Sequence, residues 1–378
     1  MIRVHVSDTL SSPHWILSLC HPLFPKARRI GAATTVRRSV GRRAALASLA
    51  TQPVGGSALE SLNAYGAAVD VSLHPQDATG APAPSACVNA ASMLHAFRSS
   101  DHTGPVAEAV YAHLSREQWA ACLQEPGYSL WSCVLDTASA NEAARLAGEV
   151  TGRVVVATRA RHAHDEEGLV RWCEHMLDLA KSVGVKQPHK KLLFRIPATY
   201  EGLAAVERLE SRGTAQCDVS TACRAHIQAA VNADASSVTV QVGAADALMG
   251  EGAGVALVAE AYERAEKVGG KSKVCAASVR SADKAAALCG ADFVLLPQSI
   301  IAELAQRPPV PRTVGGHQAT DNNEATLSLP VDGGRAALEA AAGSEATRTV
   351  ELGVSAEAEA EKEFAAYMCR IYASCGEA

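Results

Sequence analysis

Short apolar, β-branched runs alternate with Ala- and Leu-rich stretches from about residue 57 onward, and this alternation is the strongest constraint on the fold. The runs are almost uninterrupted in their hydrophobic character, as expected of strands that are buried on both faces. Repeated strand–helix–strand units indicate a parallel sheet, because two parallel strands need a crossover connection. The predicted strands cover residues 66–71, 152–158, 191–198, 216–221, 236–242, 273–279 and 292–297.

The stretches between these strands have the spacing of amphipathic helices. Residues 165–183 place Leu169, Trp172 and Met176 at helical intervals, with acidic residues between them. Residues 202–212, 222–231, 253–268 and 281–289 show similar patterns. These strands and one weaker candidate fit a closed barrel better than an open sheet. The predicted fold class is therefore α/β, a single parallel (β/α)8 TIM barrel over residues 57–307. A doubly wound sheet would need G-x-G-x-x-G after its first strand, and that motif is absent there.

The C-terminal part of the chain divides into two predicted segments. Residues 308–351 are rich in Pro, Gly, Ala, Ser and Thr, and we expect a flexible surface linker there. Residues 352–378 return to helical spacing, with Phe364, Met368, Ile371 and Tyr372 at core-like intervals. This pattern predicts a C-terminal helix that docks on the barrel.

The N-terminal segment, residues 1–55, differs in composition from the rest. It is rich in Arg, Ser and Ala, and Asp8 is its one acidic residue. That composition is typical of organelle transit peptides, so we expect import into an organelle, with the plastid stroma favoured and the mitochondrion as the alternative. Arg42-Arg43 before an apolar stretch leaves a twin-arginine signal open, and a disordered basic tail is the remaining interpretation.

Several classes of function are disfavoured by composition. The formal net charge of −5 does not suggest a nucleic-acid partner. The 11 cysteines form no C-x-x-C pair, so we expect reduced, mostly buried thiols. No apolar run reaches the roughly 20 residues that span a bilayer. His162, His164 and Asp165 offer a weak metal-ligand pattern, but an acidic helix N-terminus explains Asp165 more simply, and we expect neither a metal nor another cofactor.

A set of motifs in the central part of the chain resembles the transaldolase family. Residues 191–202 read KLLFRIPATYEG, residues 216–221 read QCDVST, residues 274–281 read VCAASVRS, and residues 290–297 read GADFVLLP. Near the start, residues 75–79 read PQDAT, and Gly152-Arg153 opens a strand. Each motif is weak alone, but they occur in the family's order with similar spacing over most of residues 59–304.

The resemblance implies aldol chemistry through a Schiff base between a lysine and a ketose phosphate. The position of the family's lysine falls on Arg195, whose guanidinium stays protonated and is a very poor nucleophile. The family's catalytic Glu and its neighbouring acid fall on Ala157 and Arg159. The remaining changes are Ala81 and Asp218 at two Asn positions and Ala244 at one phosphate-binding Arg position.

Other family positions are retained in this sequence. Asp70 is the best candidate for the first-strand Asp, with Asn63 as the alternative. The resemblance assigns a substrate- or phosphate-binding role to Asp77, Thr79, Thr199, Ser220, Ser278 and Arg280. Ser278 and Arg280 match the remaining phosphate-holding pair, so a sugar phosphate is the expected ligand. A buried hydrogen-bonded network that involves Asp77 and Arg280 is the structural alternative.

Three functions follow from these observations. We expect a non-catalytic pseudoenzyme that acts as a scaffold, a sensor or a subunit of an organelle complex, with other proteins as possible partners. The reason is that the nucleophile, an acid and a phosphate-binding Arg are lost together. The alternative is an active transaldolase of the pentose phosphate pathway that transfers a dihydroxyacetone unit between sugar phosphates. A different aldolase or isomerase reaction on the same barrel is the third possibility.

Overall fold

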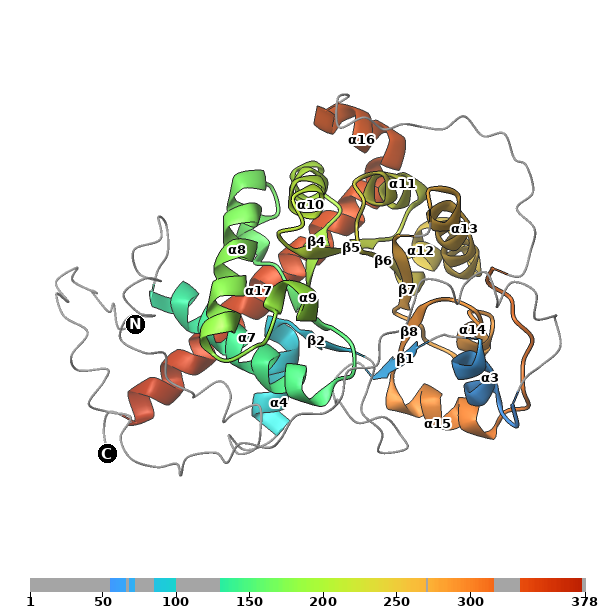
Figure 1. Cartoon of the computed structure of the whole chain (residues 1–378), viewed down its shortest axis with the longest axis horizontal. Coiled ribbons are helices and arrows are strands. Elements are labelled where there is room, and N and C mark those ends of the chain that lie inside the picture. The colour runs from blue at the N-terminus through green and yellow to red at the C-terminus, as the bar shows by residue number, and fades with distance from the viewer. Residues whose placement is uncertain are drawn as a thin grey trace, which may run out of the picture.

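In the computed structural model, eight parallel strands form one strongly curled sheet that helices surround (Figure 1). The structure describes residues 55–65, 68–71, 85–99, 130–269, 271–315 and 334–375. The strand order is β1-β8-β7-β6-β5-β4-β3-β2. The strands are β1 (Ala68–Val71), β2 (Ala86–Val88), β3 (Val154–Ala157), β4 (Leu192–Pro197), β5 (Gln216–Thr221), β6 (Ser237–Gln241), β7 (Lys273–Ala277) and β8 (Phe293–Leu296).

Each of the seven predicted strand ranges contains one observed strand, and β2 is the additional one. The terminal strands of the sheet are β1, which pairs with β8, and β2, which pairs with β3. Among the described residues no ladder joins β1 to β2. The prediction of a parallel α/β sheet is therefore confirmed, whereas closure into an eight-stranded barrel stays a prediction.

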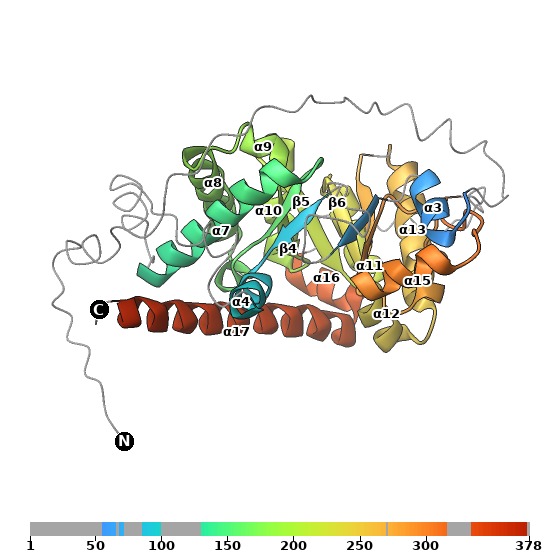
Figure 2. The same ribbon diagram turned by 90° about the horizontal axis from the view of Figure 1, so that it is seen from below.

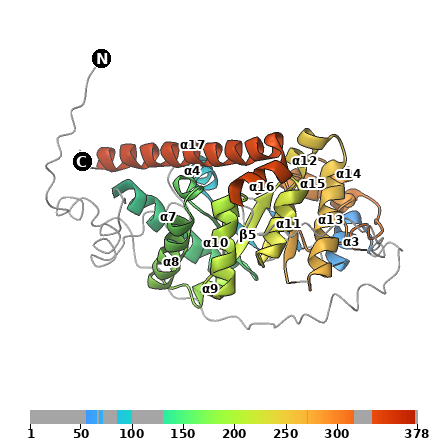
Figure 3. The same cartoon turned by 90° about the horizontal axis from the view of Figure 1, so that it is seen from above.

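The helices pack on the outer face of the sheet and at its rims (Figure 1). They are α3 (Ala58–Ala64), α4 (Ala90–Ser99), α7 (Leu130–Glu149), the 3-10 helix η1 (Ala160–His162), α8 (Glu166–Ser182), α9 (Pro188–Lys191), α10 (Tyr200–Ser211), α11 (Arg224–Asn232), α12 (Val242–Met249), α13 (Ala253–Lys267), α14 (Ala282–Ala286), α15 (Gln298–Gln306), α16 (Gly334–Ala342) and α17 (Ser344–Cys375). The long helix α17 lies along the edge of the sheet at which the strands end (Figures 2 and 3).

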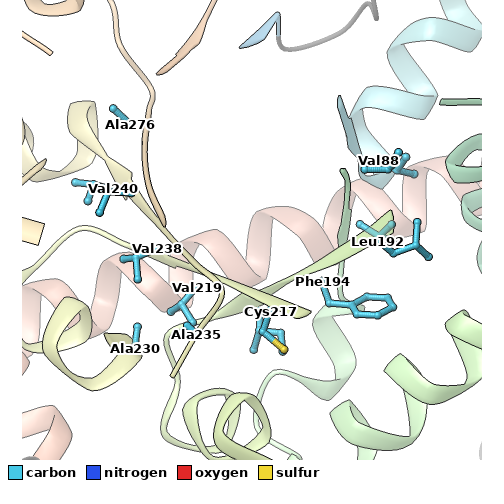
Figure 4. Packing of buried hydrophobic residues seen from close by; sticks show 14 of the residues in the cluster. Val88, Leu192, Phe194, Cys217, Val219, Ala230, Ala235, Val238, Val240 and Ala276 are labelled. Atoms are coloured by element: carbon cyan, nitrogen blue, oxygen red, sulfur yellow. The ribbon is translucent and has the colours of Figure 1, made fainter. Parts of the chain in front are cut away.

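Successive side chains along each strand alternate between two environments: the layer between the sheet and the helices, and the interior of the curled sheet. Phe194, Cys217 and Val238 are fully buried between the sheet and the helices (Figure 4). The Phe194 ring meets Trp172 of α8 edge-on, with ring centroids 5.9 Å apart. Because successive strand side chains point to opposite faces, residues one position away, such as Arg195 and Asp218, point into the interior of the curled sheet.

Helix α8 shows how the local sequence sets an element's start. Asp165 precedes the helix in an extended conformation, and its carboxylate accepts a hydrogen bond from the Gly168 N–H at 2.9 Å. Glu166 and Glu167 occupy the first turn, where negative charge favours the helix dipole. The interpretation of Asp165 as part of an acidic helix N-terminus is thereby confirmed.

The predicted linker over residues 308–351 is wrong for its C-terminal part. Residues 334–351 are helical, in α16 and the start of α17, and the predicted docking helix begins at Ser344. The reason is the high helix propensity of the Ala, Leu and Glu residues there, which outweighs the scattered Gly and Thr. Gly343, with φ +83°, separates the two helices in a conformation that glycine adopts readily.

One cysteine departs from the expectation of reduced thiols. Cys133 is disulfide-bonded. The free cysteines in the described residues are Cys87, Cys173, Cys217, Cys223, Cys275 and Cys289.

No single helix in the described residues has both the length and the apolar character needed to cross a membrane. Helices α12 and α13 meet that criterion only as a pair, and the pair is bent by 116°.

Candidate functional site

The position that the sequence assigned to a catalytic lysine holds a buried ion pair. Arg195 and Asp218 are direct neighbours in the β4–β5 register. The Arg195 Nε donates to Asp218 Oδ2 at 2.7 Å, and the Thr239 hydroxyl donates to Asp218 Oδ1 at 2.7 Å. Arg195 Nη2 lies 3.4 Å from that hydroxyl, and Nη1 lies 3.7 Å from the thiol of Cys87. Both oxygens of a carboxylate that is only 1% exposed are therefore occupied.

The electrostatics of this pair fix its protonation state. Burial by itself would lower the pKa of Arg195, but the Asp218 carboxylate outweighs it, so the pKa lies above the usual value. The guanidinium is cationic at every physiological pH and offers no lone pair for attack on a carbonyl. Burial also raises the pKa of the neighbouring Cys87 thiol, which keeps it protonated near neutral pH.

The lysines of the described residues lie elsewhere in the fold or are held by acidic partners. Among the lysines that follow a strand, Lys284 comes soonest after its carboxyl end, and its ammonium group is held by Asp246 at 2.6 Å and Glu251 at 2.8 Å. Lys362 is an exposed residue of α17. The others lie at the C-terminal ends of α8 and α13, between α8 and α9, in α9, before β7 or at its first residue: Lys181, Lys186, Lys190, Lys191, Lys267, Lys271 and Lys273.

The two acid positions that the resemblance pointed to carry no acid either. Ala157 is the register neighbour of Arg195. Arg159 is 4% exposed, and its Nε donates to Asp136 at 2.7 Å. Its guanidinium stacks over the Trp172 ring at 5.8 Å, and the indole N–H donates to the same Asp136 oxygen at 3.1 Å. This part of the site is a packed polar network.

A second cluster lies at the carboxyl ends of β5, β6 and β7. The Gln241 side chain donates to Ser220 Oγ at 3.0 Å and accepts from Ser278 Oγ at 2.6 Å. Ser278 has φ +57°, which is unusual for a residue with a side chain. Arg280 is exposed and, within the described part of the chain, has no hydrogen-bond or ion-pair partner.

Gly243 permits the placement of Arg280. A Cβ at Gly243 would lie 3.2 Å from Arg280 Nε and 3.0 Å from the Ser278 carbonyl oxygen. The guanidinium therefore rests over the first turn of α12, where backbone N–H groups are oriented towards the same space. A free guanidinium, a helix N-terminus and two hydroxyl groups are suited to an anion such as a phosphate ester.

The structure places the other predicted residues as follows. Thr199 is the N-cap of α10: its hydroxyl accepts from the Gly202 N–H at 2.9 Å and donates to the Ala163 carbonyl, which accounts for it without a ligand. Asp70 lies in β1 opposite Leu295 of β8. Asp77 and Thr79 lie outside the described residues, so their predicted roles stay predictions. Ser220, Ser278 and Arg280 are brought together.

Several site residues were missed by sequence reasoning. Gln241 and Thr239 belong to a predicted strand, and the position of Gln241 at its carboxyl end was the available signal, because barrel sites are built there. Glu357 and Glu361, described below, gave no signal of this kind. In the described residues no group of three or more His, Cys, Asp or Glu side chains could hold a metal ion.

The comparison with known families agrees with this geometry. The family Transaldolase/Fructose-6-phosphate aldolase matches residues 106–352, well over half of the chain. The chain belongs to the transaldolase family. The match includes Arg195, Asp218 and the Ser220–Gln241–Ser278 cluster, but it leaves out residues 75–79 and residues 353–375, most of α17.

Individual transaldolases are related at modest identity. A transaldolase of Chlamydia trachomatis is 30% identical over 200 residues, which is 49% of this chain and 60% of that protein. A transaldolase of Saccharomyces cerevisiae is 30% identical over 167 residues, 41% of this chain and 49% of that protein. A probable transaldolase of Anaeromyxobacter dehalogenans is 34% identical over 150 residues, which is 39% of this chain and 63% of that protein. The chain thus matches between about half and two thirds of the length of these relatives.

Proposed function

We propose that this chain is a non-catalytic member of the transaldolase family, retained as a scaffold, a sugar-phosphate sensor or a subunit of a larger assembly. The observation that carries the proposal is the Arg195–Asp218 pair at the position that the resemblance gives to the Schiff-base lysine. A cation whose charge is matched by a buried carboxylate has a structural function there, and it cannot form an iminium.

The losses around this pair support the same conclusion. General acid–base catalysis contributes about 10²–10⁴-fold to a rate, and Ala157 cannot supply it. Covalent catalysis requires its nucleophile, so a chain without the lysine cannot form the Schiff-base intermediate at all. The retained surface feature is the cluster of Arg280, Ser278 and Gln241, which we propose binds the phosphate group of a sugar phosphate. A closed eight-stranded barrel, which we also propose, would place this cluster at its carboxyl-terminal face.

The proposal is tested by trapping the iminium. Borohydride in the presence of fructose 6-phosphate reduces a Schiff base to a stable adduct that intact-mass spectrometry counts. We expect no adduct above the background of a barrel protein without transaldolase activity, whereas an active transaldolase treated in parallel gives one. A specific adduct mapped to a lysine inside the barrel would establish the active-enzyme alternative.

From the composition of residues 1–55 we further propose that this segment is removed on import into an organelle, a plastid before a mitochondrion. Mass spectrometry of the endogenous protein tests this. A mature chain that retains Met1 or Ile2 contradicts it. Size-exclusion chromatography of the same material shows whether the protein travels alone or in a larger complex, which separates the scaffold and subunit roles from the sensor role.

A further inference from the structure

Helix α17 lies against the carboxyl ends of the strands on the β2–β4 side, where it runs past η1, α4 and α7 (Figures 2 and 3). The helix is well anchored at this place. Phe364 and Met368 are fully buried, and Arg98 of α4 lies over the Tyr367 ring at 5.8 Å. Apolar packing thus anchors the helix at this place.

Two carboxylates of α17 bind backbone groups at this rim. Glu357 Oε1 accepts a hydrogen bond from the Ala90 N–H at 3.2 Å, directly after β2. Glu361 Oε1 accepts from the Ala160 N–H at 3.0 Å, after β3. Ala90 and Ala160 are the first residues of α4 and η1, so their N–H groups have no partner within their own helices. Groups of this kind attract anions, and here the anions are supplied by the chain itself.

The same carboxylates change the charge balance at the rim. Arg159 and Arg195 are already paired with Asp136 and Asp218. Because each of these two guanidinium groups already has a carboxylate partner, Glu357 and Glu361 add two carboxyl groups that neither guanidinium balances. Burial raises the pKa of both glutamates, and the attraction of Arg159 opposes this only in part. The charged form of either carboxyl group acts in a poorly solvated place, where its interactions are screened little.

We propose that α17 is an autoinhibitory segment whose Glu357 and Glu361 occupy the N–H groups of the rim and weaken the binding of a sugar phosphate to the barrel. The inference rests on the proposed sugar-phosphate binding at Arg280. Both glutamates lie beyond residue 352, where the family match ends.

The test compares the Glu357→Gln/Glu361→Gln double variant, and each single variant, with the unchanged chain. Glutamine retains an oxygen that accepts the same hydrogen bonds, so α17 stays docked while the charges are removed. The binding of fructose 6-phosphate and of inorganic phosphate is measured by calorimetry at low salt. We expect about tenfold tighter binding of both ligands to the double variant, and a smaller difference at high salt.

The matched control is Glu359→Gln on the same helix. Glu359 is 69% exposed and contacts Lys362 at 3.2 Å, so its substitution should leave binding unchanged. Equal affinity in the double variant and the unchanged chain overturns the autoinhibitory role, and so does an equal gain in the Glu359 control.

Arg280→Ala in both backgrounds separates this inference from the proposed function. If Arg280→Ala weakens binding while the glutamate variants do not alter it, the autoinhibitory role is wrong and the phosphate site stands. If the double variant binds more tightly but Arg280→Ala has no effect, α17 is inhibitory and the assignment of the site to Arg280 is wrong. If no variant binds either ligand, both proposals fail.

Discussion

The Nε atom of Arg195 donates a hydrogen bond to Oδ2 of Asp218 at 2.7 Å, across two adjacent strands. Thr239 from a third strand holds the other carboxylate oxygen. The pair thus ties β4, β5 and β6 together inside the curled sheet. Because Asp218 is almost fully buried, its carboxylate needs the guanidinium as a partner, and the identity of residue 195 cannot be changed without consequences for Asp218.

We expect Arg195→Lys alone to restore no transaldolase activity. The new ammonium group would lie beside the buried Asp218 carboxylate, which stabilises the protonated amine and so suppresses its attack on a carbonyl. Ala157 would still provide no acid, and catalytic groups that act as a set are strongly non-additive. Borohydride trapping with fructose 6-phosphate, read by intact mass, should give no adduct. A specific adduct on Lys at position 195 would show that the lysine was the one missing element.

Asp218→Asn should destabilise the fold by about 2–3 kcal/mol, because it leaves the guanidinium without its charged partner. Urea unfolding measures the loss. Asp234→Asn is the control: it removes a carboxylate that is 60% exposed and pairs with Lys271 at 3.3 Å, where a change of about 0.5 kcal/mol or less is expected. The Arg195→Met/Asp218→Asn variant should recover part of the loss, since no uncompensated charge remains. Equal stabilities of the two single variants would contradict a structural role for the pair.

Arg280→Ala should abolish phosphate binding. Arg280 has no protein partner in the described part of the chain and can make bidentate contacts with a phosphate group. We expect the unchanged protein to bind fructose 6-phosphate with a dissociation constant in the high micromolar to millimolar range, about −4 to −6 kcal/mol. Phosphorus NMR titration measures this affinity. Arg212→Ala, an exposed residue at the C-terminal end of α10, is the control, and an unchanged affinity in Arg280→Ala would make the cluster purely structural.

Stability should fall with acid through His226. Burial lowers the pKa of this histidine from 6.5 to about 4, and its Nδ1 has no hydrogen-bond partner among the residues that the structure describes. Between these values the unfolded chain binds a proton that the folded chain does not, so the contribution of His226 to stability is complete above pH 6.5 and is lost as the pH falls towards 4. At pH 5 the loss is about 2 kcal/mol relative to pH 7.

His226→Gln should remove this part of the pH dependence, measured by urea unfolding at pH 7 and pH 5. His189→Gln, on an exposed residue of α9, should leave the dependence unchanged. The prediction is wrong if the two variants respond to pH in the same way.

Two of the helices that the sequence did not predict, α7 and α12, have different physical causes. Residues 133–143 of α7 are buried on all sides, so their apolar side chains do not follow the one-sided period of a surface helix. Helix α12 is short, and it begins directly where β6 ends, so its start was read as part of the strand. Strands β1 and β3 to β8 each lie within a predicted range because each is a short, largely apolar run between helical stretches.

The sequence by itself determined the parallel sheet, the family and the replacement of the expected lysine by Arg195, because these depend on local composition and on the order of motifs. The tertiary structure decided what those residues touch. Asp218 neutralises Arg195 across a strand pair, Gln241 joins Ser220 to Ser278, and Glu357 reaches the N–H of Ala90 over 267 positions of sequence. Contacts of this kind leave no periodic trace along the chain, because they depend on the curl of the sheet and on the path of α17 across its edge.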